Sequence, residues 1–237
     1  GEQSYTLPQA YRETVKRLRS VKNHYKPRGI GLTTKNVFPV LLHPFARAGI
    51  DPGVKFMKES YSPVIYAIAL GAAMQYDQEL MVCPDFWQAS ARNRFPGHSA
   101  EEYRSSLLMA YWLGARGIFT EYWTALYDPE TNGPNRRGKV LRWFTRTYVP
   151  SHPRKYDLSD AEPEVALVRF PSSAFGQPVM NYPNRLYGVK NLTSSDKNSE
   201  WLEAWKLLSH GVVDEPVLYQ GNHRKPYEFF VPLNNVA

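Results

Sequence analysis

Three acidic residues follow short β-like runs in this chain, and their side chains can do chemistry together. Glu59 lies in Phe-Met-Lys-Glu-Ser, Asp85 in Cys-Pro-Asp-Phe-Trp, and Glu121 in Phe-Thr-Glu-Tyr-Trp. A pair of carboxyl groups can cleave a glycosidic bond, because one protonates the leaving oxygen while the other acts as nucleophile or activates water. We therefore take Glu59, Asp85 and Glu121 as candidate catalytic residues.

Aromatic side chains stand close to these acidic residues in the sequence. Aromatic residues make up 14% of the chain, with 6 Trp and 16 Tyr. Aromatic rings suit the C–H faces and hydroxyl rims of sugars, although any one of these rings can equally fill a core. The candidate sugar-binding aromatic residues are Tyr61, Trp87, Tyr122 and Trp123.

The loop after the Asp85 run adds two polar candidates, Arg94 and His98. We expect this loop at the same rim as the carboxylates, where both side chains can contact a substrate. Local roles compete with this interpretation: Glu59 can pair with Arg94 or Lys58, Asp85 can cap the turn that follows it, and His98 directly precedes a helix cap.

The acidic residues belong to four repeats of one pattern, a β-like run and then a stretch with helical spacing. Strands alternating with helices at intervals of about thirty residues are typical of βαβ units and a parallel sheet, in a barrel or an open form. In a barrel, the three carboxylates would gather at the carboxyl-terminal rim, where barrel enzymes place their chemistry. The predicted strands are 28–34, 54–60, 80–87 and 116–123, and the predicted helices are 37–48, 63–76, 99–113 and 138–149, after a first helix over 7–21.

Several single residues carry structural predictions of their own. Ser99-Ala-Glu-Glu resembles a capping box in which Ser99 and Glu102 satisfy each other's backbone donors. Gly71 and Gly114 are expected at helix ends that pack tightly on a strand. Cys83, the only cysteine, lies in an apolar run and is expected to be a buried thiol rather than a nucleophile.

The composition shifts after Tyr122, and a polar, turn-rich loop follows over 127–138. A polar stretch over 151–163 is typical of an interdomain linker. The apolar run 164–170 predicts a strand, and 200–208 predicts an amphipathic helix. We therefore expect a barrel-type unit over 1–150 and part of a second α/β domain over 164–237.

Composition and motifs argue against several other classes of protein. The formal charge is +7, but no nucleic-acid-binding module is recognisable, and the longest apolar stretch is too short to span a membrane. The histidines lack metal-ligand spacing and no phosphate-binding or dinucleotide fingerprint occurs, so we expect no metal and no cofactor. The first residues have no signal-peptide pattern, so the sequence does not indicate where the protein resides.

Several motifs resemble the β-galactosidase-like glycoside hydrolases with (β/α)8 barrels. Residues 71–82, 96–99 and 111–121 resemble the last two barrel units of that group. Residues 165–168, 186–192 and 201–212 are similar to the glutamine-amidotransferase-like domain that follows its barrel. The resemblance implies the C-terminal half of a (β/α)8 TIM barrel, followed by part of a second, flavodoxin-like α/β domain.

The resemblance also implies a retaining mechanism, with the acid/base on the fourth barrel strand and the nucleophile on the seventh. If 116–122 is the eighth strand, Asp85 falls nearest the nucleophile position and Glu59 lies on the sixth strand. The usual nucleophile is Glu, and the first four strands with their acid/base are absent from this sequence. A shifted strand count would make Glu121 or Glu59 the nucleophile.

The predicted function is thus an exo-acting, β-galactosidase-like glycoside hydrolase or a fragment of one, with a carbohydrate substrate. The alternative is a non-catalytic carbohydrate-binding or assembly protein that keeps the barrel rim. Four strand–helix units leave open sheet edges, which favour pairing with another chain. We expect a homo-oligomer or a complex with a missing N-terminal half, and doubtful activity for the isolated chain.

Overall fold

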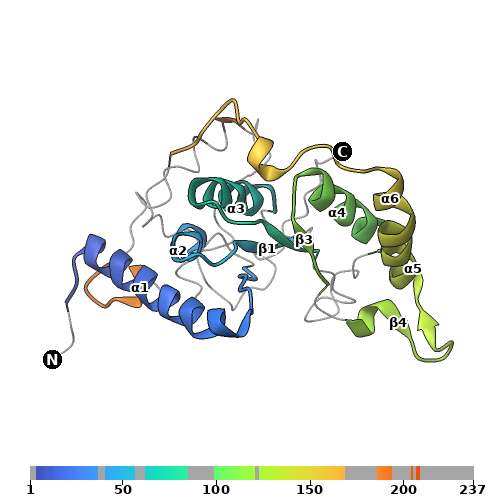
Figure 1. The fold of residues 1–237 in the computed structure, drawn as a ribbon, viewed down its shortest axis with the longest axis horizontal. Helices are drawn as coiled ribbons and strands as arrows, with labels where there is room; N and C mark the ends of the chain where they lie inside the picture. The colour runs from blue at the N-terminus through green and yellow to red at the C-terminus, as the bar shows by residue number, and fades with distance from the viewer. Residues whose placement is uncertain are drawn as a thin grey trace.

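A computed structural model gives the fold of this protein (Figure 1). It describes residues 4–36, 41–56, 62–84, 99–120, 123–168, 186–193, 204 and 207–208. The architecture is mixed α/β, with a small parallel sheet at the centre and helices packed around it.

The parallel sheet contains β1 (Gly53–Phe56), β2 (Met81–Pro84) and β3 (Gly117–Ile118), side by side in chain order. Gly53 pairs with Met81, and Met81 with Gly117. Residues 33–36 run parallel to the other edge of β1 through the bridges Thr33–Asp51 and Asn36–Val54. The prediction of a parallel sheet is therefore confirmed.

The predicted helices are present with shifted bounds. Helix α1 extends to Tyr25, and the last helix is interrupted by a π-helical turn over Phe144–Tyr148. Ser99 and Glu102 form the predicted capping box, with Ser99 N 2.6 Å from Glu102 Oε2 and Glu102 N 3.1 Å from Ser99 Oγ. The α-helices are α1 (Leu7–Tyr25), α2 (Leu42–Ala48), α3 (Ser62–Tyr76), α4 (Ala100–Trp112), α5 (Arg136–Trp143) and α6 (Val149–Ser151).

Short elements complete the described part of the chain. The polar stretch after residue 126 forms a small antiparallel hairpin, and Asn135 then caps α5 by accepting from Gly138 N at 3.0 Å. These elements are η1 (Lys26–Arg28), η2 (Trp123–Leu126), β4 (Tyr127–Asp128), β5 (Gly133–Pro134), η3 (Phe144–Tyr148), η4 (Leu158–Asp160) and η6 (Leu186–Gly188).

The main core lies between the sheet and α3. Val54 of β1 and Val82 of β2 are fully buried against Ile65 and Ala69 of α3. Helix α3 is apolar around most of its circumference, as expected of a helix covered on several sides. A second core under α4 and α5 centres on Tyr103, Leu107 and Phe144.

Gly53 and Gly114 lie where the backbone needs a missing side chain, and Gly71 does not. A Cβ on Gly53 would lie 1.9 Å from the carbonyl oxygen of Thr34, so glycine permits the close approach of two strands. Gly114, just past α4, has a φ of +94° and matches the predicted helix end. Gly71 was wrongly predicted at a tight helix end: it lies within α3 with nothing within 4 Å of a Cβ placed there.

The predicted linker packs against the first unit. Arg154 Nη1 donates to the carbonyl oxygens of Tyr111 at 2.8 Å and Ala115 at 3.1 Å. The hydroxyl of Tyr111 donates to His152 O at 2.8 Å. We call residues 152–160 the crossing segment, because they cross the C-terminal end of α4.

The strand predicted over 164–170 is wrong for its described part, since residues 164–168 form no strand. Val165 is 61% exposed and Val168 is 86% exposed. An apolar run becomes a strand only where a neighbouring strand satisfies its backbone, and these residues pair with none of the described strands. The helix predicted over 200–208 is described at Ala204, Leu207 and Leu208, all three helical.

Residues 186–193 lie against the beginning of α1. Tyr5 N donates to Asn191 Oδ1 at 3.1 Å, and Asn191 Nδ2 donates to Tyr5 O at 2.7 Å. The rings of Tyr11 and Tyr187 meet edge to face at 6.2 Å. Segments 186 positions apart in the sequence are therefore joined.

No helix in the described ranges is both long and apolar enough to cross a membrane.

Candidate functional site

The carboxyl ends of β1, β2 and β3 lie at one edge of the sheet, because the three strands are parallel and adjacent. In the sequence, Glu59 follows the last residue of β1 by three positions, Asp85 follows β2 directly, and Glu121 follows β3 by three positions. The predicted site therefore belongs to segments that leave one edge of the sheet.

The predicted site residues themselves fall outside the described part of the structure. This applies to Glu59, Asp85 and Glu121, and to Tyr61, Trp87, Arg94, His98 and Tyr122. Trp123 is described only in its backbone, which begins the 3-10 helix η2. Among the described residues, the polar or reactive side chains near this edge are those of Lys55, Cys83, Tyr103 and Thr120.

Lys55 is the buried charged residue of the described chain, with 9% of its surface exposed. It precedes the last residue of β1 and pairs in register with Cys83, which is fully buried as predicted. Side chains alternate between the faces of a sheet. Because Val54 and Val82 face α3, Lys55 and Cys83 belong to the opposite face.

A buried ammonium group is costly unless its surroundings compensate the charge, so buried lysines mark sites where charge has a use. Sequence reasoning passed over Lys55 because it stands inside a run interpreted only as a strand. The sequence feature that could have identified Lys55 is a charged residue between Val54 and Phe56 in a β-like run.

Tyr103 of α4 reaches the end of β3, where its hydroxyl oxygen lies 2.6 Å from Thr120 Oγ1. The Tyr103 side chain is 2% exposed. Burial raises the pKa of Tyr103 to about 12, and the hydrogen bond to Thr120 opposes that rise. Tyr103 is thus a neutral phenol that fixes the residue directly before Glu121.

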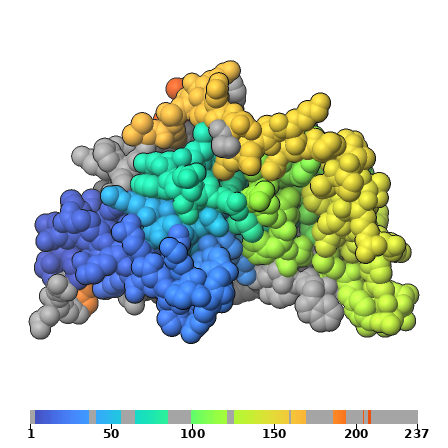
Figure 2. Space-filling model, viewed as in Figure 1, coloured from blue at the N-terminus to red at the C-terminus, as the bar shows by residue number. Residues whose placement is uncertain are grey.

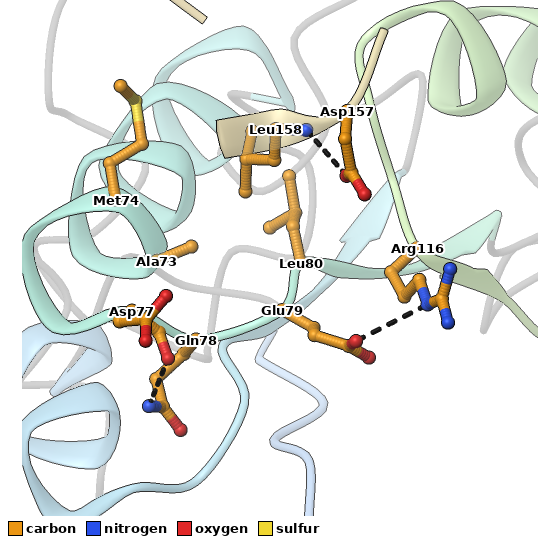
Figure 3. Close-up of a pocket in the computed structure, with 9 residues that line it drawn as sticks. All are labelled: Ala73, Met74, Asp77, Gln78, Glu79, Leu80, Arg116, Asp157 and Leu158. Carbon is orange, nitrogen blue, oxygen red and sulfur yellow. Dashed lines mark hydrogen bonds and ion pairs between the residues drawn. The ribbon is translucent and has the colours of Figure 1, made fainter. Parts of the chain in front are cut away.

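A hollow of about 520 Å³ opens at the other edge of the sheet, where β2 and β3 begin (Figure 3). Leu80 and Leu158 form its apolar floor, and Glu79 Oε1 lies 3.3 Å from Arg116 Nε at its rim. Both ionic side chains are more than half exposed. This hollow therefore lies at the edge of the sheet opposite the carboxyl ends of the strands.

Asp51 stands near the same edge and accepts a hydrogen bond from Glu79 N at 3.2 Å. Burial raises the pKa of the Asp51 carboxyl, and the Glu79 charge adds to the rise. Within the described residues, no cluster of three or more His, Cys, Asp or Glu side chains is arranged to hold a metal ion.

Comparison of the chain with protein-family models, with curated proteins and with solved structures finds no match. The features of this chain that bear on its function are the parallel sheet and the residues at its carboxyl edge.

Proposed function

We propose that this chain is a glycoside hydrolase of the retaining, β-galactosidase-like type, or a fragment or subunit of one. Glu59, Asp85 and Glu121 would supply the paired carboxyl groups, and Tyr61, Trp87, Tyr122 and Trp123 the sugar-binding rings. Arg94 and His98 would contact the substrate from the loop after β2. The observation that carries the proposal is the parallel, consecutive order of β1, β2 and β3.

The consecutive order supports a barrel. In doubly wound open sheets the strand order reverses at a switch point, whereas in a (β/α)8 barrel each strand joins the previous one. Residues 33–36, β1, β2 and β3 follow one another without a reversal. We propose that they form the second half of such a barrel, with part of a flavodoxin-like domain after it.

Sequence parity supports a common face for the carboxylates. Glu59, Asp85 and Glu121 stand four, two and two positions after Lys55, Cys83 and Phe119. Phe119 directly follows Ile118, the register partner of Val82, and so corresponds to Cys83. If the chain continues extended beyond each strand, even separations give the same face. We therefore expect the carboxylates on the side of the sheet to which Lys55 belongs, where a cation favours the ionised form of a nearby carboxyl group.

The small number of strands predicts that this chain pairs with another chain. Half a barrel exposes backbone donors and acceptors at its edge strands, and these favour pairing with another chain. We propose that the active form is a homo-oligomer or includes an N-terminal half that supplies the acid/base.

The test is hydrolysis of a panel of aryl glycosides by the chain alone and by the chain with any upstream portion of the same gene product. Asp85→Asn, Glu59→Gln and Glu121→Gln are compared with Glu130→Gln, a change in the hairpin away from the sheet. Loss of at least a thousandfold in kcat for one of the three amide variants, with Glu130→Gln unchanged, supports the proposal.

Failure of every preparation to hydrolyse any aryl glycoside overturns the enzymatic proposal. If sugar binding is then still measured by calorimetry and is weakened by Trp87→Ala, the chain is the non-catalytic carbohydrate-binding protein instead.

A further inference from the structure

The excess positive charge of this protein is concentrated in one segment. Residues 4–36 contain eight Lys or Arg residues and a single acidic residue, Glu13, whereas the rest of the chain contains 21 residues of each sign. The whole formal charge of +7 therefore belongs to α1 and the residues that follow it. A dispersed, solvated surface charge would not be distributed in this way.

Helix geometry arranges part of this charge in a row. Arg12, Lys16, Arg19 and Lys26 are separated by four, three and seven residues, steps that stay on one face of an α-helix and of the 3-10 turn that continues it. At 1.5 Å per residue, the row is about 21 Å long. We call these four residues the basic stripe.

The basic stripe faces solvent. All four residues are exposed, and α1 lies along the surface over its whole length (Figure 2). Arg19 Nη2 donates to Arg47 O at 3.2 Å, which ties that guanidinium to the end of α2. Glu13 Oε2 lies 3.7 Å from Lys16 Nζ, and this exposed pair costs little to open.

The face of α1 beside the basic stripe packs on the protein. Ala10 and Val15 are buried, and Val15 stands three residues after Arg12 and four before Arg19. The Arg47 guanidinium lies 5.3 Å from the ring centroid of Tyr11. An amphipathic helix that lies in a membrane buries its apolar face in the lipid, but this apolar face packs on the protein. The stripe therefore offers charge without apolar anchors.

The charge spacing indicates the kind of polyanion. Double-stranded DNA presents one charge about every 1.7 Å along its axis, whereas the stripe presents four cations over about 21 Å. Single-stranded nucleic acids are held largely by stacking on aromatic rings, and the stripe contains none. A linear polymer with one carboxylate on each sugar has a lower charge density than DNA, and its negative charges complement this row of cations.

We infer that the basic stripe of α1 is a docking surface for an acidic polysaccharide, one that carries a carboxylate on each sugar. The choice of a sugar polymer rests on the proposed function, and the surface itself rests on the charge distribution. Docking there would hold a polymeric substrate at the protein while its end is processed at the sheet edge.

The test is binding of the full chain to polygalacturonate, measured by calorimetry at several salt concentrations with neutral dextran as the control polymer. The variant combines Arg12→Gln, Lys16→Gln and Arg19→Gln. Its matched control removes three exposed cations of the α5 region, with Lys139→Gln, Arg142→Gln and Arg146→Gln. Circular dichroism and thermal melting verify that both triple variants are folded.

We expect wild type to bind polygalacturonate and not dextran, with an affinity that falls as salt rises. The stripe variant should lose at least tenfold in affinity at low salt and about 2 in the slope of log K against log salt. The control variant should lose less than threefold.

Three results overturn the inference: no binding of polygalacturonate by wild type, equal losses in both triple variants, or tighter binding of duplex DNA or anionic vesicles than of polygalacturonate at the same salt. Aryl glycoside hydrolysis is measured in parallel, so that a failure of the proposed function is distinguished from a failure of the docking surface.

Discussion

At the scale of single residues, tyrosines with raised pKa values connect this structure to pH. Burial raises the pKa of Tyr103 to about 12 and also raises the pKa of Tyr66. Tyr76 is only partly buried, and burial together with Tyr11 raises its pKa to about 12. A phenol with a raised pKa is neutral in both states below pH 10. Above that value the unfolded chain loses its proton first, so the free energy of unfolding falls as pH rises from about 10 to about 12.

Tyr103→Phe tests this linkage. At pH 8 we expect a loss of about 1 kcal/mol in the free energy of unfolding, because the hydrogen bond to Thr120 disappears. Between pH 9 and 11 the variant should lose less stability than wild type, by about 1 kcal/mol, since one proton linkage has been removed. Urea unfolding at each pH measures both numbers. Equal pH dependence of the two proteins would show that Tyr103 titrates normally.

At the scale of elements, the helix ends show which features of the fold local sequence can predict. The Ser99 cap, the Gly114 helix end and the length of α3 follow from local chemistry, and the sequence predicts all three. The strand over 164–168 does not form, because an apolar run needs a neighbouring strand, which local chemistry does not reveal.

Part of the candidate site is likewise predictable from local sequence, and part depends on contacts between distant segments. The order of the strands, and hence the common edge that Glu59, Asp85 and Glu121 follow, is predictable from the repeats. Lys55 was not found, because its importance comes from burial beside Cys83, a contact made across two strands. The concentration of positive charge in residues 4–36 is visible in the sequence. The side chains of the basic stripe come into line only because α1 is helical.

Ser99→Ala tests the capping box of α4. One backbone donor, Glu102 N, loses its partner, and we expect a loss of about 1 kcal/mol in the free energy of unfolding. The control is Ser105→Ala in the same helix, an exposed position where alanine is the better helix former. A loss at Ser105 as large as the loss at Ser99 would contradict this assignment.

Gly71→Ala should stabilise the protein by about 0.5–1 kcal/mol, because alanine has less freedom to lose in the unfolded chain and meets nothing within 4 Å in α3. Gly114→Ala should destabilise it by more than 1 kcal/mol, since its φ of +94° strains any other residue. Thermal melting of the two variants compares the same substitution in opposite settings. A loss of stability at Gly71 would show that the helix is packed there.

At the scale of the whole molecule, the crossing segment ties the chain beyond α6 to the sheet. Arg154 donates to two carbonyl oxygens near the end of α4, its backbone N donates to the Tyr111 hydroxyl at 2.8 Å, and its guanidinium lies 5.4 Å from the Tyr111 ring centroid. Leu158 then packs on the main core. The crossing segment is thus anchored by Arg154 and by Leu158.

Arg154→Met should lower the free energy of unfolding by about 1.5–3 kcal/mol, because hydrogen bonds from a charged donor to carbonyl groups are lost. The matched control is Lys155→Met, a neighbouring exposed cation whose loss should cost less than about 0.5 kcal/mol. Urea unfolding gives both values. Similar costs for the two variants would mean that Arg154 contributes only its charge.

The two hydrogen bonds between Tyr5 and Asn191 have a consequence for the order of folding. Residue 5 leaves the ribosome long before residue 191, and a contact across 186 positions cannot form until both are free. The contact that joins the beginning of α1 to Asn191 can therefore form only after synthesis has passed Asn191. During translation, the most positively charged part of the protein is the part whose final contact comes late.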